Sequence, residues 1–522
     1  MTLRLYNTRT KTAEEFIPRE PGIATIYVCG PTVYDRSHLG HMRAASVFDI
    51  LRRYLEATGF AVTHVQNITD IDDRIIERAN AEGVATATVT ARYIAEYHAA
   101  CAALNMLRPH IEPQASQHVP EILKMIARLI EGGSAYAAEG DAYFDVTTFP
   151  AYGRFSGKVL EDLRAGARVE LGEHKRHPAD FALWKRAKPG EPSWDSPWGP
   201  GRPGWHIECS AMSLKYLGMG FDIHGGGSDL IFPHHENEIA QSEAFAGRAP
   251  FVRYWIHNAM VMVDGEKMSK SLRNYISVAD ALARFPADVI RYTLGAVHYR
   301  KPMEVNQERL EDASRAIERL HAALASIGAV MRQAGKKRIG GEPSEVLATA
   351  AAEARTAFFA GMDDDLNTSR ALAAVFDLVG VVNRATDRVL KGLTPAPEVL
   401  PGLVDVRDAL VGLTSILGLR LADSAGEEGI LRRVRELAAA LRTEAGHLYA
   451  TEPGATLDEV VASILAGREH ARQGKEFAVA DRIRARLAEA GVLVEDLPTG
   501  PRWRLAAPST ASVLVDAGDN AG

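Results

Sequence analysis

Two histidines flank a leucine and a glycine early in the chain, at His38-Leu39-Gly40-His41. The apolar residues that follow recur at helical spacing, so we expect this segment in the loop that enters a helix. Free backbone amides and the helix dipole favour a phosphate there, and two imidazoles can hydrogen-bond phosphoryl oxygens. Coincidence or a helix-capping role more often explains such a short string when it stands alone.

A second polar segment, Lys267-Met268-Ser269-Lys270-Ser271, follows an apolar stretch. Lys267 and Lys270 on a polar loop could clamp a triphosphate as negative charge accumulates on it. A solvated basic turn is the alternative for any isolated lysine pair. Both segments in this order, on either side of one expected parallel sheet, favour nucleotide activation.

Four further side chains offer sulfur, nitrogen and oxygen donors: Cys29, Cys209, His234 and Glu238. His234 and Glu238 are four residues apart and would share one face of a helix. The four donors suit zinc, but they are far apart in sequence and lack the compact CxxC pairs of structural zinc fingers. Spacing alone therefore leaves open a second interpretation, in which both cysteines are simply buried and His234 and Glu238 form a surface contact.

Other cysteine, histidine and glycine patterns in the sequence give weaker evidence for a functional site. Cys101 lies within a helical, alanine-rich stretch, and we interpret it as a buried small residue. A His-Glu-x-x-His protease motif is excluded, because the position four after His235 is Ile239. The three glycines at Gly225–Gly227 could admit a nucleotide or form a turn, and they do not form a dinucleotide fingerprint.

The elements that must position these residues follow from apolar periodicity. Ile23–Gly30 and Phe60–Ile68 are typical of buried strands, and the segment between them has helical spacing from Met42 onwards. A strand, crossover helix and strand make a parallel unit, whose ligands bind beyond the carboxyl ends of the strands. Phe251–Val263 is expected as a returning core strand, followed by a turn before Lys267.

We therefore expect an α/β fold: a Rossmann-like parallel-sheet catalytic domain over residues 1–304, with an irregular insertion at about 112–203. Helical spacing over residues 305–420 predicts a helix bundle. Residues 421–505 are expected to form a small α+β module with a basic helix and a hairpin. The small and polar residues 506–522 are typical of a disordered tail.

Composition narrows the class of protein. The chain has 522 residues, three cysteines and a formal net charge of -7. An odd number of scattered cysteines argues against a disulfide framework, and no stretch is long and apolar enough to be a membrane span. We expect a cytosolic multidomain protein. The net charge does not indicate nucleic acid, although local basic faces stay compatible with it.

Five blocks in order carry a specific resemblance: YVCGPTVYDRSHLGH, NITDIDD, GWHIECSAMS, HGGGSDLIFPHHENEIAQSEA and KMSKS. Together they resemble cysteinyl-tRNA synthetases, a family of class I aminoacyl-tRNA synthetases, over roughly residues 3 to 504. The one departure in these blocks is modest, since Leu39 stands where many relatives have isoleucine.

The resemblance implies roles for individual residues. One zinc ion per chain would be bound by Cys29, Cys209, His234 and Glu238 and would recognise the sulfur of cysteine. The cysteine pocket would be lined by Thr69, Trp205 and His224, and Asp229 would contact the ribose of ATP. His38, Gly40, His41, Lys267 and Lys270 would bind ATP together with Mg²⁺, and the two histidines and two lysines among them would be catalytic.

The reaction implied is attack of the cysteine carboxylate on the α-phosphorus of ATP, followed by transfer to the 3′ end of tRNA(Cys) by a protein that we expect to be a monomer. A thiol that coordinates a metal is readily deprotonated, whereas the hydroxyl of serine is a poorer ligand. Two alternatives stay open: a ligase that joins cysteine to an amino sugar, and a catalytically silent RNA-binding relative. The helical stretch from Asp363 and the basic end from Gly467, which resemble tRNA-binding parts, favour the tRNA ligase over the amino-sugar ligase, and the intact HLGH, KMSKS and four ligand positions argue against the silent relative.

Overall fold

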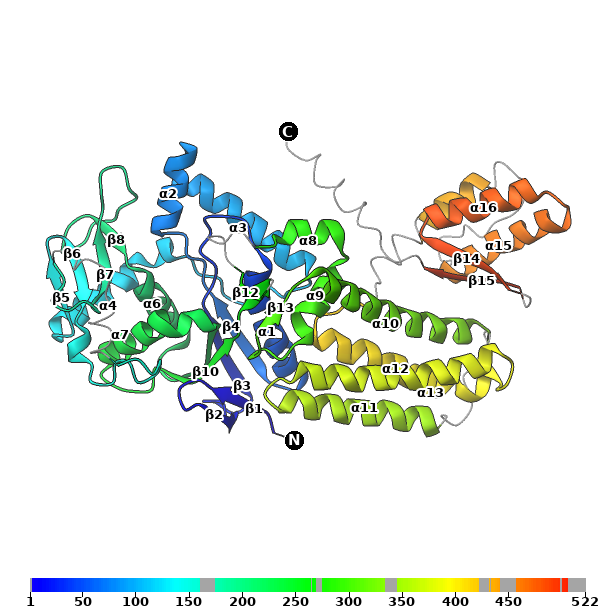
Figure 1. Cartoon of the computed structure of the whole chain (residues 1–522), viewed down its shortest axis with the longest axis horizontal. Coiled ribbons are helices and arrows are strands. Elements are labelled where there is room, and N and C mark those ends of the chain that lie inside the picture. The colour runs from blue at the N-terminus through cyan, green and yellow to red at the C-terminus, as the bar shows by residue number, and fades with distance from the viewer. Residues whose placement is uncertain are drawn as a thin grey trace.

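The computed structural model describes residues 2–159, 174–263, 265–268, 275–333, 345–421, 431, 433–441, 457–497 and 500–505 (Figure 1). Lys270 and the tail 506–522 lie outside the described residues. None of the helices in the described part of the chain is long and apolar enough to cross a membrane.

A four-stranded parallel sheet forms the centre of the first part of the chain. Its strand order is β10-β9-β3-β4, from β3 (Ile23–Val28), β4 (Ala61–Gln66), β9 (Phe221–Gly227) and β10 (Val252–Asn258). Helix α1 (Leu39–Ala57) connects β3 to β4, and both β3–β4 and β3–β9 pair in parallel. Strands buried on both faces explain the continuous apolar runs in the sequence. The predicted parallel unit is confirmed.

The expected single strand Phe251–Val263 is wrong. It divides into β10, in the parallel sheet, and β11 (Val261–Val263), in a separate sheet of order β12-β11-β13. Between them the backbone pairs elsewhere, because Ala259 N donates to Tyr299 O and Met303 N donates to Met260 O. The other two strands of this sheet are β12 (Glu266–Lys267) and β13 (Met303–Glu304).

The segment that we expected to be irregular, at about 112–203, contains a second sheet. Four antiparallel strands have the order β5-β6-β7-β8 and the bounds Ala135–Ala138, Asp141–Phe144, Phe181–Arg186 and Gly201–Pro203. Pro203 is tolerated because β8 is an edge strand. Helix α4 (Val119–Glu131) shares an apolar cluster with this sheet and with Ile207 and Ala240 of the helices that carry the site.

The remaining elements of this part surround the sheet. Helices α2 (Asp73–Glu82) and α3 (Thr86–Ala103) follow β4, and β1 (Arg4–Asn7) and β2 (Thr12–Glu15) form a hairpin at the amino terminus. Helices α6 (Trp205–Leu217) and α7 (Glu236–Ala246) flank β9 in sequence. Helices α8 (Val278–Arg284) and α9 (Ala287–Ala296) lead towards the bundle.

Long helices form the bundle that the apolar spacing predicts: α10 (Gln307–Gln333), α11 (Glu345–Asp363), α12 (Thr368–Leu390) and α13 (Ala396–Ile416). Pro401 lies inside α13 rather than in a loop, within its second turn. Figure 1 shows the bundle on the opposite side of the parallel sheet from the inserted sheet.

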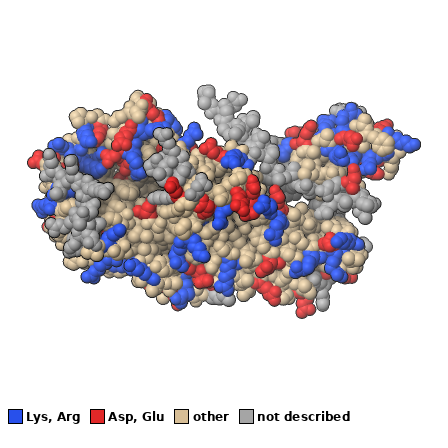
Figure 2. All heavy atoms as spheres, in the orientation of Figure 1, with Lys and Arg blue, Asp and Glu red and all other residues tan. Residues whose placement is uncertain are grey.

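A small α+β unit follows. Helices α15 (Leu457–Gln473) and α16 (Phe477–Glu489) pack on the hairpin of β14 (Val492–Leu497) and β15 (Gly500–Leu505). Arg468 fastens α15 to the hairpin with two hydrogen bonds to the Asp496 carboxylate, at 2.7 and 2.8 Å. Basic and acidic side chains are interspersed over this unit in Figure 2.

Candidate active site and metal centre

The carboxyl end of β3 and the start of α7 bring sulfur, nitrogen and oxygen donors together. Cys29 directly follows β3, Cys209 lies on α6, and Glu238 lies on α7. A break in helical geometry at Phe232, with φ of -137°, separates His234 from the preceding turn. The four-residue spacing of His234 and Glu238 then places His234 Nε2 at 3.1 Å from Glu238 Oε1.

The donor atoms of Cys29, Cys209, His234 and Glu238 all lie within 4.8 Å of one another. Cys29 Sγ lies 3.8 Å from Cys209 Sγ and 3.7 Å from Glu238 Oε1. Tetrahedral zinc, with bonds of about 2.0–2.3 Å, requires neighbouring donors roughly 3.3–3.8 Å apart. The spacing of these side chains therefore fits a tetrahedral metal ion, and the two thiols suit zinc among the common metals.

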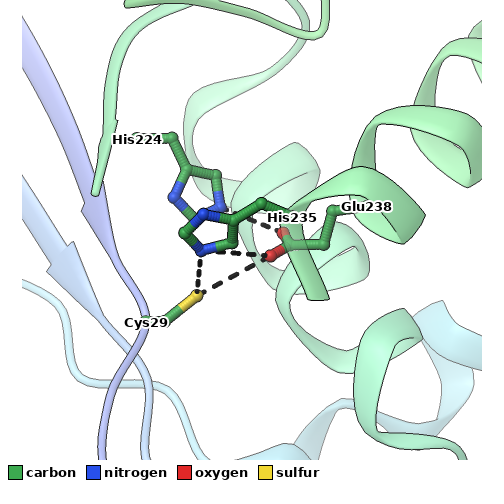
Figure 3. A group of neighbouring side chains, drawn as sticks. All are labelled: Cys29, His224, His235 and Glu238. Carbon is green, nitrogen blue, oxygen red and sulfur yellow. Dashed lines mark hydrogen bonds and ion pairs between the residues drawn. The ribbon is translucent and has the colours of Figure 1, made fainter. Parts of the chain in front are cut away.

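A second group of donors overlaps the first: Cys29, His224, His235 and Glu238 (Figure 3). His235 Nε2 lies 3.3 Å from Cys29 Sγ, and His224 Nε2 lies 3.0 Å from Glu238 Oε2. The two groups share Cys29 and Glu238. Because only the first group contains two thiols, it is the better zinc site.

Charges in this cluster are strongly coupled. Burial disfavours a charged Glu238, but His224 and His234 outweigh it and lower its pKa to about 2. Burial likewise opposes protonation of His234, yet Glu238 and Cys209 raise its pKa to about 10. A hydrogen bond from Cys29 lowers the pKa of Cys209 to about 6, whereas burial raises the pKa of Cys29. Cys209 is thus the first thiol to ionise.

Neighbouring side chains hold the cluster in place. His206 Nδ1 lies 3.0 Å from His234 Nδ1, which fixes the ring of His234 through the nitrogen that faces away from Glu238. His235 Nδ1 lies 2.7 Å from His257 Nε2, and His257 in turn contacts the Thr8 hydroxyl. Such partners orient metal ligands. We missed His206, His235 and His257 at the sequence level, although the adjacent histidines in IFPHHENE are a signal for a dense histidine cluster.

Among the expected pocket residues, Trp205 packs beside the cluster, with its ring centroid 4.4 Å from that of His234. His224 is fully buried on β9 and stacks on Trp255, so its Nε2 orients Glu238. Thr69 is buried after β4, and its hydroxyl donates to Glu208 Oε2 at 3.1 Å. Glu208 is another residue that we missed, because its position before Cys209 gives no periodic signal.

The segment expected to bind ATP lies at the amino terminus of α1. His38 is the N-cap, its Nδ1 accepts from Gly40 N at 3.1 Å, and its ring stacks on His41 with centroids 3.7 Å apart. Met268 is buried against Gly40. The backbone of Lys267 lies in β12, whereas Asp229 lies in a short 3₁₀ turn after β9.

Comparisons with known proteins agree with this geometry. The model described as "tRNA synthetases class I (C) catalytic domain" matches residues 15–315, a DALR domain matches 357–422, and a cysteinyl-tRNA ligase anticodon binding domain matches 455–504. A cysteine–tRNA ligase from Desulfitobacterium hafniense is 46% identical over 505 residues, which cover 97% of this chain and 100% of that protein.

The chain belongs to the cysteine–tRNA ligase family. Another member, from Geobacter sulfurreducens, is 46% identical over 510 residues, again 97% of this chain and 100% of the relative. Among solved structures, Mycobacterium tuberculosis methionyl-tRNA synthetase bound by methionyl-adenylate has a TM-score of 0.58 and 14% identity, and covers 79% of this chain and 94% of its own. At that identity it supports the class I fold alone.

Membership of the ligase family indicates that the donor cluster and the start of α1 act in the same reaction. The donor cluster after β3 could hold a metal ion, and the positive end of the α1 dipole favours a phosphate, although the amides of the first turn are hydrogen-bonded within the protein. Both lie beyond the carboxyl end of β3, where ligands bind in open parallel sheets.

Proposed function

We propose that this protein activates L-cysteine with ATP and charges tRNA(Cys) with it. The cysteine carboxylate attacks the α-phosphorus of ATP, the bond to pyrophosphate breaks, and cysteinyl-adenylate forms. A ribose hydroxyl at the 3′ end of tRNA then attacks the carbonyl and displaces AMP. A carboxylate is already a nucleophile, so positioning and charge stabilisation supply most of the acceleration of the first step.

The ATP side of the reaction belongs to the start of α1 and the segment after β11. His38 and His41 donate to phosphoryl oxygens, and Gly40 lets the nucleotide approach the helix. Lys267 and Lys270 neutralise charge that builds up on the triphosphate, together with Mg²⁺ on its oxygens. Asp229 contacts the ribose of ATP. The N-cap position of His38 and its stacking on His41 support this assignment.

The amino-acid side belongs to the donor cluster. A zinc ion bound by Cys29, Cys209, His234 and Glu238 would accept the substrate's sulfur as thiolate and so separate cysteine from serine, whose oxygen is a poorer ligand. Thr69, Trp205 and His224 line the pocket. His224 holds one oxygen of Glu238, and this leaves the other oxygen free to face His234 and Cys29.

The remaining parts of the chain serve the RNA. We divide it into a catalytic domain (1–304, with the insertion at about 112–203), a tRNA-binding bundle (305–420) and an anticodon-recognition module (421–505). The match of residues 455–504 to an anticodon binding domain supports the last assignment. We further propose that the protein acts as a monomer in the cytosol, and sedimentation of the purified chain tests the first of these two points.

One observation carries the metal part of the proposal: four zinc-type donors within 4.8 Å in a chain 46% identical to cysteine–tRNA ligases. Cysteine-dependent exchange of pyrophosphate into ATP, measured before and after chelation with the metal content determined in parallel, tests it. We expect exchange to be lost with the metal and restored by added zinc. Undiminished exchange in verified metal-free protein would refute recognition of cysteine through the metal.

A second assay identifies the acceptor. Purified protein receives labelled cysteine and ATP with either tRNA or an amino sugar. We expect label only in tRNA, because the chain carries the bundle and the anticodon module beyond its catalytic part. Failure to label tRNA, with pyrophosphate exchange intact, would contradict the tRNA ligase assignment and favour the amino-sugar ligase.

A further inference from the structure

Glu208 is a completely buried carboxyl group with only half of its acceptors in use. It lies on α6, immediately before Cys209, and its side chain has 0% exposure. Oε2 accepts a hydrogen bond from the Thr69 hydroxyl at 3.1 Å, whereas Oε1 has no partner among the described residues. A buried carboxylate without a cation is unfavourable, so a ligand that supplies the missing charge and donors would be stabilised there.

Acidic groups act electrostatically on Glu208. They are the Asp70 and Asp72 carboxylates, from the loop after β4, and the thiol of Cys209. Asp70 is occupied by Ser116, whose backbone N and hydroxyl both donate to it, and Asp72 pairs with Arg74. An acidic surrounding of this kind attracts a cation and repels a second carboxylate.

Three hydrogen bonds fix where Glu208 stands relative to the donor cluster. Gly30 N donates to Asn67 Oδ1 at 2.9 Å, Asn67 Nδ2 donates to the Thr69 oxygen at 3.1 Å, and Thr69 donates to Glu208. Asn67 and Thr69 are 0% and 2% exposed, so water does not compete for these bonds. This series of hydrogen bonds begins at Gly30, the residue after Cys29, and ends at Glu208, the residue before Cys209.

Gly30 shows how tightly this arrangement is built. A Cβ atom at Gly30 would lie 1.5 Å from the carbonyl oxygen of Asn67, so only glycine lets the two backbones approach this closely. The close backbone contact fixes Asn67 beside the residue that follows Cys29, and the side chains of Asn67 and Thr69 in turn orient Glu208 Oε2. Oε1 is the atom left over for a ligand.

The cysteine substrate is small enough for its amino group to lie near Glu208 Oε1 when its sulfur lies at the donor cluster. Its sulfur and its amino nitrogen are separated by three bonds, so a substrate whose sulfur lies at the donor cluster must place its ammonium group close by. Glu208 is adjacent in sequence to Cys209, one of those donors, and carries the unpartnered acceptor.

We propose that Glu208 binds the α-ammonium group of the substrate through Oε1, and that Asn67 and Thr69 are positioning residues for it. This inference rests on the proposed function and deepens it, because it assigns the amino-group subsite of the same pocket. Glu208 then separates amino acids from thiol acids, whereas the sulfur donors separate thiols from alcohols.

The test compares ligands that differ by one group: L-cysteine, cysteamine, which lacks the carboxylate, and 3-mercaptopropionate, which lacks the amino group. Binding of each to the metal-loaded protein is measured by calorimetry for the wild type and for Glu208→Gln. A charge-assisted hydrogen bond is at stake, so we expect the affinities for cysteine and cysteamine to fall about 10- to 100-fold. The affinity for 3-mercaptopropionate should stay unchanged.

Two variants accompany this comparison. Glu121→Gln is the matched control, since Glu121 forms a partly exposed ion pair with Lys215 on α6 at 2.6 Å, and all three affinities should be retained. Glu208→Asp keeps the negative charge but places it one methylene group further from the ligand. It should lower the affinity only for cysteine and cysteamine, the two ligands with an amino group. It also serves if Glu208→Gln does not fold, as judged by thermal unfolding and metal content.

The outcomes are distinct. An equal loss for all three ligands means that Glu208 only maintains the pocket, and unchanged cysteine binding in a folded variant means that it makes no contact; each overturns the subsite. Serine is measured as a fourth ligand, and wild-type protein that binds cysteine no better than serine would instead overturn the proposed function, and the subsite with it.

Discussion

Cys29 and Cys209 illustrate how a residue's role depends on its partners. Cys101 is buried, as Cys209 is, but its neighbours are Tyr97 and the apolar core, and burial raises the pKa of its thiol to about 12. Cys209 has a lowered pKa because Cys29 and His234 hydrogen-bond its thiolate. A low-pKa thiol is the better metal ligand, since the thiolate is the binding form.

Cys209→Ser tests this difference. The serine oxygen is a poor substitute for thiolate, so we expect metal affinity to fall by more than about 100-fold, with a corresponding loss of pyrophosphate exchange. Metal content after dialysis against a weak chelator measures the effect. Cys101→Ser is the matched control and should retain its metal; a control that also loses metal would show that the effect is general destabilisation.

His64 on β4 provides a pH-dependent contribution to stability. It is 5% exposed, both ring nitrogens lack partners among the described residues, and burial together with Arg52 lowers its pKa to about 3. In the unfolded chain the His64 imidazole is protonated near pH 6.5, whereas in the folded protein it is protonated only near pH 3. Stability is therefore fully present above pH 6.5 and is lost as the pH falls towards 3.

Urea unfolding at pH 7.5 and pH 5 measures this contribution. At about 1.4 kcal/mol per pH unit, His64 accounts for roughly 2 kcal/mol of the stability lost between these values. In His64→Gln the loss between the two pH values should be smaller by that amount. An identical loss in wild type and variant would mean that His64 is protonated in the fold.

At the scale of elements, the start of α1 is joined to both ends of the lysine-bearing segment. Ile276 O accepts from Leu39 N, and Ser37 O accepts from Val278 N, so the residues just before α8 pair with the entry to α1. On the other side of that segment, Met268 packs on Gly40, and its sulfur accepts from Ile276 N at 3.4 Å. Met268 thus couples the two proposed ATP-binding segments.

Met268→Ala should loosen that coupling. We expect the KM for ATP in pyrophosphate exchange to rise about tenfold, because lost packing costs about 1–3 kcal/mol, and the KM for cysteine to change little. Met268→Leu retains the volume and should restore most of the ATP affinity. Equal rises in both KM values would indicate a general disturbance of the catalytic domain.

Periodicity in the sequence was enough to predict β3, β4, α1 and the long bundle helices, since their apolar positions recur over many residues. The inserted sheet was not predicted because β5 to β8 are short strands between turns. In β8 the Gly and Pro residues are ones that indicate a turn rather than a strand. The four proposed metal ligands came from a resemblance, not from spacing, because their contacts depend on how separate elements fold together. Glu208 and His235 were invisible for the same reason.

At the scale of the whole molecule, Asp365 joins the bundle to the amino-terminal hairpin and to the segment after α9. Its carboxylate accepts from Tyr6 N at 2.8 Å, from the Tyr299 hydroxyl at 2.6 Å and from Arg300 Nε at 2.6 Å. Its backbone N donates to Arg4 O. A single turn between α11 and α12 therefore contacts both the amino-terminal hairpin and the segment that leaves α9.

Asp365→Ala leaves these donors unpaired, so we expect a loss of about 3 kcal/mol in the free energy of unfolding. Transfer to tRNA should fall more than pyrophosphate exchange, because the bundle loses its fixed position against the sheet. Asp364→Ala is the matched control: Asp364 is 64% exposed and should change stability by less than about 0.5 kcal/mol. Thermal unfolding and the two assays give the comparison.

The bond between Tyr6 and Asp365 spans 359 positions of the chain. During synthesis, the amino-terminal strand leaves the ribosome first but meets its partner only after the turn that follows α11 has been made. The hairpin of β1 and β2 can pack on β10 before that, because Asn7 donates to Arg253 O and accepts from Trp255 N, and it gains the bond to Asp365 only later. The first residues of the chain thus take part in one of the latest contacts of this half of the molecule to become possible.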